Sequence, residues 1–110
     1  MLFFKKKTNN VKNNNDREII EANASAMEPL FVLAKDEELK AEFKKIQEQI
    51  KYIIALPDSK AMDYDKKIKN AISDIKIELV KDKNDEKAVA KIQSLISDLK
   101  LLIAERKALV

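Results

Sequence analysis

The chain has 110 residues, which is enough for one domain with a modest hydrophobic core and too few for two. It contains no glycine and two prolines, and 37% of its residues are charged, a composition that favours long helices over hairpin turns. Cysteine and histidine are both absent, which excludes disulfides, thiolate chemistry and the commonest metal ligand. The sequence therefore predicts an all-α protein without catalytic, cofactor-binding or metal-binding residues, and it predicts no small-molecule substrate.

The net charge of +3 is located near the start of the chain. Residues 16–110 hold 18 basic and 19 acidic residues, so they are close to neutral. Residues 1–15 contain no acid and four lysines, Lys5, Lys6, Lys7 and Lys12. Because this segment is rich in asparagine and lacks an apolar period, we predict a flexible basic arm at 1–15 and a single helical-bundle domain at 16–110.

The arm begins with a small apolar patch, Leu2, Phe3 and Phe4, directly before three consecutive lysines. One interpretation is that the two phenylalanines pack on the bundle while the lysines remain in solvent. The other is that the patch enters a membrane interface and the lysines contact anionic lipid, at about 1 kcal/mol each. The sequence leaves both interpretations open.

The first helix is expected to begin near Asp16, because Asn15 and Glu18 have the spacing of a capping box. Pro29 cannot donate a hydrogen bond inside a helix but suits a first turn, so we predict a kink or a restart there. The apolar run at 30–34 follows, and it predicts either a buried short helix or a plug over the end of the bundle.

Asp36 is placed to cap the next helix, which Pro57 terminates. Apolar residues in this helix recur at alternating steps of four and three. That pattern is typical of a helix packed nearly parallel or antiparallel to its neighbours. The residues of this seam are Leu39, Phe43, Ile46, Ile50 and Ile53.

Two further helices are predicted, from about Lys60 to Val80 and from about Glu86 to Ala108. The first has the seam Tyr64, Ile68, Ile72, Ile75 and Leu79, and the second has the seam Val89, Ile92, Ile96, Leu99 and Ile103. Because the linkers between the long helices are short, neighbouring helices must be antiparallel. The predicted fold class is all-α, an up-down antiparallel helical bundle of three long helices plus a kinked N-terminal helix.

The last helix repeats part of the helix before it, since six of the ten residues in 91–100 are identical to those in 67–76. On a helical wheel Ile77 and Leu101 lie opposite the seams, whereas Leu95 and Leu102 widen the apolar arc of the last helix. Either this helix is central in a four-helix arrangement or it forms a subunit interface. The candidate interface residues are Leu95, Leu101, Leu102 and Ile77.

Two acidic pairs, Asp63 with Asp65 and Glu38 with Glu42, are close enough in sequence to be considered as catalytic carboxylates. Catalytic pairs need different surroundings that separate their pKa values. Every acid here lies among lysines in the sequence, so we interpret these residues as solvated faces and helix ends. We predict that the protein is not an enzyme.

These features favour a non-enzymatic helical interaction or scaffold module that self-associates, with a homodimer as the expected form. The alternative is an electrostatic binder of nucleic acid or of an anionic membrane surface through Lys5, Lys6, Lys7 and Lys12. No apolar run approaches the ~20 residues of a membrane-spanning helix. We therefore expect a cytoplasmic protein, with peripheral membrane contact under the alternative.

Overall fold

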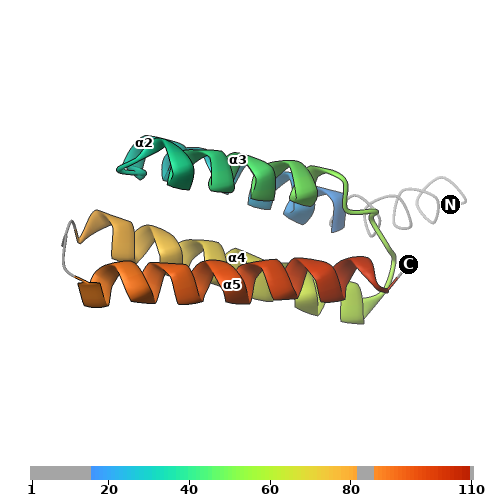
Figure 1. Cartoon of the computed structure of the whole chain (residues 1–110). Coiled ribbons are helices and arrows are strands. Elements are labelled where there is room, and N and C mark those ends of the chain that lie inside the picture. The colour runs from blue at the N-terminus through green and yellow to red at the C-terminus, as the bar shows by residue number, and fades with distance from the viewer. Residues whose placement is uncertain (1–15, 82–85, 110) are drawn as a thin grey trace, which may run out of the picture.

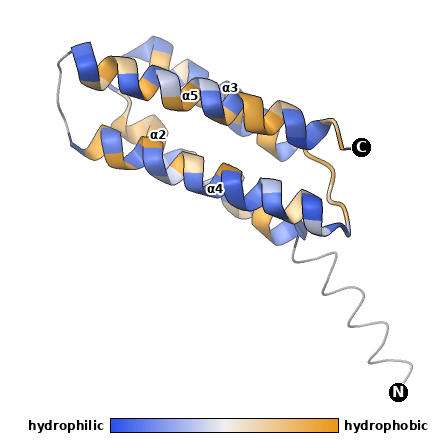
Figure 2. Cartoon of the chain, turned by 90° about the horizontal axis from the view of Figure 1, so that it is seen from below, coloured by the Kyte–Doolittle hydropathy of each residue, from blue (hydrophilic) through white to orange (hydrophobic). Residues whose placement is uncertain are grey.

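The computed structural model describes residues 16–81 and 86–109, and within them it shows helices and no strands. A helix at 16–26 is followed by α2 (Glu28–Leu33), α3 (Glu37–Lys51), α4 (Ser59–Val80) and α5 (Glu86–Lys107). Figure 1 shows two layers: the helix at 16–26, α2 and α3 form one layer, and α4 and α5 form the other. In the view of Figure 2, turned by 90°, α3 lies over α5 and α2 lies over α4.

The chain turns between the first helix and α2, as Pro29 predicted. Residue Met27 occupies the turn, its backbone N–H donates to Ala24 O at 3.2 Å, and the proline lies in the first turn of α2. Leu30 is fully buried, whereas Val32 is 85% exposed. The short helix α2 therefore covers the core with one side and leaves its other side in solvent.

Side chains at the starts of the long helices fix their boundaries. Asp36 Oδ1 accepts a hydrogen bond from Leu39 N at 2.7 Å, which confirms the predicted cap of α3. Asp58 Oδ1 accepts from Lys60 N at 3.0 Å and so caps α4. Each such cap is worth about 1 kcal/mol, because it satisfies a backbone donor that has no partner within the helix.

The three predicted seams form the core. Ile96, Leu99 and Ile103 on α5 are buried against the seam residues of α3 and α4. Three predictions about the helices are wrong. Tyr64 is predicted in a seam but is only half-buried, and α3 ends at Lys51 instead of reaching Pro57. Val89 is predicted in the seam of the last helix, but its side chain is 53% exposed. The reason is that α5 packs mainly on α4, and the space between its first turns and α3 is an open cleft.

The two ends of the bundle differ in what they contain. At one end the start of the first helix meets the segment before α4 and the C-terminal part of α5, where Asp16 Oδ2 accepts from Leu56 N and from Arg106 Nη2. From this end α4 runs to the opposite end, and α5 returns (Figure 1). The opposite end contains the start of α3 and the start of α5, and the cleft opens there.

The long helices α3, α4 and α5 carry both polar and apolar residues along their length (Figure 2). None of the helices in 16–81 and 86–109 is both long enough and apolar enough to cross a membrane.

Substitution of Ile75 by Ala should destabilise the fold far more than the same change two residues later. Ile75 is fully buried in the core, whereas Ile77 is 51% exposed on the same helix. We expect Ile75→Ala to lower the free energy of unfolding by about 2–5 kcal/mol through lost burial and a residual cavity. Ile77→Ala should cost less than about 1 kcal/mol. Urea denaturation followed by circular dichroism measures both, and equal losses would contradict the assignment of the α4 seam.

Candidate functional site

Three charged side chains lie together inside the bundle, and we call them the ionic cluster: Asp16, Asp65 and Arg106. All three side chains are 0% exposed. Arg106 Nε donates to Asp65 Oδ1 at 3.0 Å, and Arg106 Nη2 donates to Asp16 Oδ2 at 3.3 Å and to the Ile54 carbonyl at 2.8 Å. The cluster thus joins the first helix, the segment before α4, α4 itself and α5.

Helical spacing explains why these side chains point inward. Arg106 follows Leu99 by seven residues and Ile103 by three, so it continues the buried face of α5. Asp65 precedes Ile68 by three residues and therefore lies on the buried face of α4 in the same way. The sequence analysis placed Asp65 on a solvated face together with Asp63. That assignment is correct for Asp63, which is exposed, and wrong for Asp65.

The ionic cluster contains more negative than positive charge and leaves polar atoms without partners. Two carboxylates face one guanidinium, which gives a net charge of −1 when all three are ionised. Asp16 Oδ1, Asp65 Oδ2 and Arg106 Nη1 form no hydrogen bond within the part of the chain that the structure describes. Buried charge of this kind is costly unless it is neutralised or paired.

The surroundings of Asp65 raise its pKa to about 7. Burial is the largest cause, followed by the side-chain hydrogen bond that a protonated Asp65 would make with Asp16. The charge of Asp16 adds to the effect, while the charge of Arg106 opposes it. A carboxylic acid at Asp65 would remove one negative charge and supply a donor to Asp16. We therefore interpret Asp65 as protonated below about pH 7, which removes the excess negative charge of the cluster.

Two buried amides extend this network toward the first helix. Asn23 Nδ2 donates to the Asp65 carbonyl at 3.0 Å, and Gln47 Nε2 donates to the Ala24 carbonyl at 2.8 Å. They bind the first helix to α4 and to α3. Since the ionic cluster is fully buried, no substrate reaches its carboxyl groups, and its chemistry is structural.

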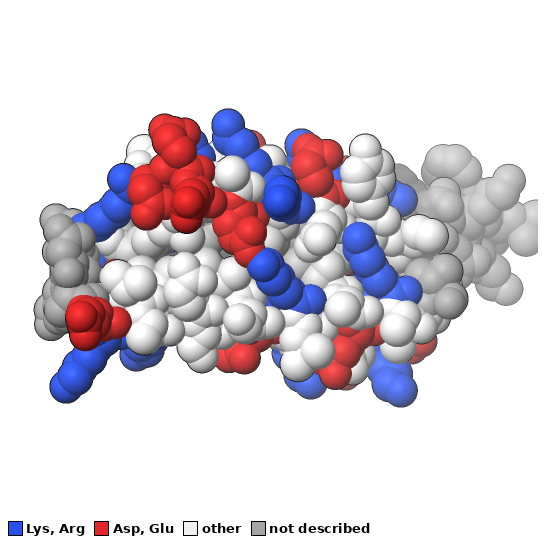
Figure 3. Space-filling model, in the orientation of Figure 1, with Lys and Arg blue, Asp and Glu red and all other residues white. Residues whose placement is uncertain are grey.

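A cleft of about 460 Å³ lies between the start of α3, the end of α4 and the start of α5. We call it the acidic cleft. Its apolar floor contains one residue of α3, one of α4 and two of α5, namely Leu39, Leu79, Val89 and Ile92. Its rim contains one lysine, Lys35, and four acidic residues, Asp36, Glu38, Glu42 and Glu78. In Figure 3 acidic side chains gather over the first part of α3, next to uncharged surface between α3 and α5.

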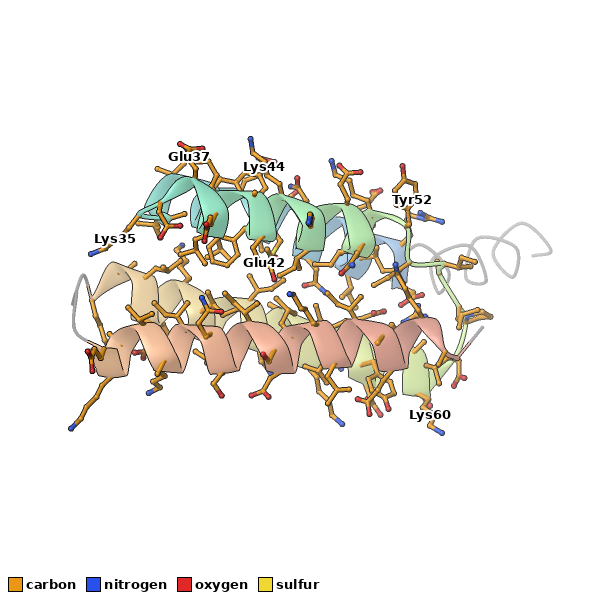
Figure 4. All side chains as sticks on the ribbon, in the orientation of Figure 1. Lys35, Glu37, Glu42, Lys44, Tyr52 and Lys60 are labelled. Atoms are coloured by element: carbon orange, nitrogen blue, oxygen red, sulfur yellow. The ribbon has the colours of Figure 1, made fainter. Side chains whose placement is uncertain are left out.

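The rim acids have different partners. Glu78 pairs with Lys81 at 3.0 Å and with Lys91 at 3.5 Å, and the hydrogen bond from Lys81 is the main reason that the pKa of Glu78 is lowered. Glu42 points from α3 toward α5 (Figure 4) and forms an ion pair with Lys100. Glu38 is exposed, and it has no ion-pair partner among the described residues.

The surface beyond the Glu42–Lys100 ion pair is basic. The same face between α3 and α5 continues toward the C-terminal end of α5 as a shallower depression. Its charged residues are Glu42, Lys45, Lys100 and Lys107. The face thus changes from acidic to basic along the bundle, with the ion pair at the boundary.

The four predicted interface residues differ in how far they are exposed. Leu95 and Leu102 are half-buried and pack against the core of their own chain. Leu101 and Ile77 are exposed, at 59% and 51%, on surfaces that do not line the acidic cleft. The predicted electrostatic residues Lys5, Lys6, Lys7 and Lys12 fall outside the described residues. The sequence does not predict the cleft, although it places Val89 in an apolar seam and Glu38 in an acidic pair.

Fold and sites together define an all-α protein with a buried ionic cluster at one end and an open acidic cleft at the other. Among its described residues no group of three or more acidic side chains is arranged to hold a metal ion. Comparison of the chain with protein-family models, with curated proteins and with solved structures finds no match. Function is therefore argued from the two sites alone.

Loss of the guanidinium should be strongly destabilising. Arg106→Met keeps much of the side-chain volume but leaves Asp16 and Asp65 buried without their counter-charge. We expect the free energy of unfolding to fall by about 3–5 kcal/mol. Arg17, the other arginine of the chain, is exposed, and Arg17→Met should change stability by less than about 1 kcal/mol. Urea denaturation at pH 7 compares the two variants, and similar small losses would show that the cluster contributes little.

Asp65 should also make stability depend on pH. In the unfolded chain its pKa is near 3.8, and in the folded chain it is about 7, so between these values the folded state binds more protons. The contribution of Asp65 to stability therefore decreases as the pH rises from about 4 to about 7, by at most on the order of 4 kcal/mol. Asp65→Asn keeps an acceptor for Arg106 and a donor for Asp16 without the titration.

The variant should therefore gain stability relative to the natural chain as the pH rises through this range, and the difference should level off above about pH 7. Urea denaturation at half-unit steps of pH measures the difference, and Asp63→Asn serves as the exposed control. Parallel stability profiles for Asp65→Asn and the natural chain would rule out a raised pKa at Asp65.

Proposed function

We propose that this protein is a non-enzymatic helical interaction module whose copies bind each other through the acidic cleft, and that its helices form an up-down antiparallel bundle. The observation that carries the proposal is the cleft. A single chain leaves an apolar floor in contact with solvent there, inside a rim of mostly acidic residues.

The size and composition of the cleft support a binding role. Its volume of about 460 Å³ lies within the range of cavities that hold ligand-sized groups. Val89 is 53% exposed and Ile92 is half-buried, although both continue the apolar seam of α5. Covering such side chains is favourable by roughly 25 cal/mol for each Å² of apolar surface removed from water.

Ion pairs between the helices around the cleft support the proposal that it is a preformed surface. Glu42 and Lys100 join α3 to α5 at its inner edge, and Lys91 pairs with Glu78 to join α5 to α4. The ionic cluster holds α4 and α5 together at the far end. A partner would therefore bind to helices that are already in position, which reduces the ordering cost of association.

The acidic rim also selects the charge of a partner, since a basic segment would complement it. A second copy of this chain carries such a segment at 1–15, with four lysines and no acid. The alternative function, in which these lysines bind nucleic acid or an anionic membrane surface, stays a prediction, because no described residue bears on it.

Two substitutions on α5 test the proposed surface. Val89 lines the cleft at 53% exposure, and Leu101 lies on another face of the same helix at 59% exposure. Replacing either exposed residue by Lys should cost little folding free energy. If copies associate through the cleft, Val89→Lys should raise the dissociation constant of the self-associated form by about tenfold or more, because it places a charge on the apolar floor.

Leu101→Lys is the matched control and should leave self-association unchanged. Light scattering over a wide range of protein concentration gives the mass and the dissociation constant for each variant. A natural chain that stays monomeric at millimolar concentration would refute the proposed function. Loss of association in Leu101→Lys alone would move the interface to the outer face of α5.

A further inference from the structure

We infer that the group bound in the acidic cleft is residues 2–7 of a second copy of the chain, with Phe3 and Phe4 on the apolar floor and the lysines at the acidic rim. This inference rests on the proposed function and names the segment that performs it. The cleft and Asp16, the first described residue after the segment, lie at opposite ends of the bundle, so we propose that copies exchange these segments.

The order of residues in the segment matches the layout of the cleft. Leu2, Phe3 and Phe4 are followed at once by Lys5, Lys6 and Lys7. The cleft places an apolar floor beside a rim with four acidic residues and one lysine. Aromatic side chains bring the largest apolar area per residue to a contact, and lysines can bury their stems while the ammonium groups meet carboxylates.

One rim residue is well placed for the lysines. Glu38 is exposed and has no ion-pair partner among the described residues, so a new ion pair would not first break an existing one. Glu78 and Glu42, by contrast, already pair with lysines of the bundle. Glu38 is therefore the rim residue whose charge should matter most to a bound lysine.

Charge along the bundle favours binding between copies over binding within one chain. Asp16, which follows the segment, is held at the end of the bundle where Arg106 lies. From Arg106 back to Val89 the distance along α5 is about 26 Å, at 1.5 Å per residue. A segment that folds back on its own bundle along this face must carry its lysines past Lys45, Lys100 and Lys107. Like charges oppose that route.

A second copy approaches from the other end. If two bundles lie side by side in opposite directions, the start of each first helix is beside the cleft of its partner. The segment then meets the acidic surface over the first part of α3 before it reaches the floor (Figure 3). Reciprocal exchange fills both clefts and closes the assembly as a two-fold dimer.

The first experiment uses full-length chains with matched substitutions. Phe3→Ser with Phe4→Ser should raise the dissociation constant of the dimer by about tenfold or more. Glu38→Lys should weaken the dimer as well. Glu37→Lys is its control, since Glu37 occupies the same first turn of α3 but does not line the cleft and points away from α5 (Figure 4). Both lysines disturb the helix dipole alike, so only the rim position distinguishes them.

The second experiment separates exchange between copies from binding within a chain. One variant carries Glu38→Lys, and the other carries Lys5→Glu, Lys6→Glu and Lys7→Glu. Each substitution alone weakens the attraction between segment and rim, so each variant should dimerise poorly. Mixed in equal amounts, they bring the basic segment of the first variant to the unchanged acidic rim of the second. The acidic segment of the second variant meets a rim where residue 38 is now basic and lies near Lys35, so a heterodimer should form. Multi-angle light scattering, with a mass tag on one variant, measures it.

The outcomes separate the two proposals. If Val89→Lys disrupts the dimer but the variants at Phe3, Phe4 and Lys5–Lys7 leave it intact, the inference is overturned and the cleft remains the interface. A mixture without heterodimer would also overturn it, because binding within one chain cannot be restored by mixing. A natural chain without any dimer would overturn both proposals.

Discussion

The fold depends on one buried guanidinium. Arg106 is the group that connects the start of the first helix, the segment before α4, α4 and α5, through the side chains of Asp16 and Asp65 and the carbonyl of Ile54. Apolar packing would allow these helices to slide along each other, because one aliphatic residue fits a seam about as well as another. A guanidinium that donates to two carboxylates on different helices does not allow this, since a shift of one turn leaves three buried ionisable groups without partners. The cluster therefore fixes the register of the helices as well as stabilising the fold.

The end of the bundle that holds the ionic cluster is closed, whereas the opposite end is open. There α3 and α5 are joined by the Glu42–Lys100 ion pair, and beyond it their facing sides line the acidic cleft. The seam of α5 continues into the cleft through Ile92 and Val89, so the same apolar pattern that builds the core also supplies the floor. The core and the proposed binding surface belong to one stripe of side chains, which is covered along most of α5 and uncovered in its first turns.

Much of the fold could be predicted from the sequence, because seam spacing, the Asp36 cap and the Pro29 restart are local features. The ionic cluster could not be predicted in this way, because Asp65 and Arg106 occupy seam positions of helices that are rich in charged residues. A charged residue there is as consistent with a frayed helix end as with a buried pair. Only the packing of α4 against α5 brings the two residues to 3.0 Å. For Val89 the spacing correctly predicts the apolar side of α5, but it does not predict that this side is exposed there. A helical period indicates which side of a helix is apolar and not which element packs against it.

The two ends are linked through Asp16. Because its carboxylate is held by Arg106 and by Leu56 N, Asp16 lies at the end of the bundle away from the cleft. The basic surface formed by Lys45, Lys100 and Lys107 lies between Asp16 and the chain's own acidic rim. A loosened cluster would release the first helix and with it this separation. The buried charge that fixes the register of the helices thus also holds Asp16 away from the cleft, which supports the proposal that the cleft binds the basic segment of a second copy.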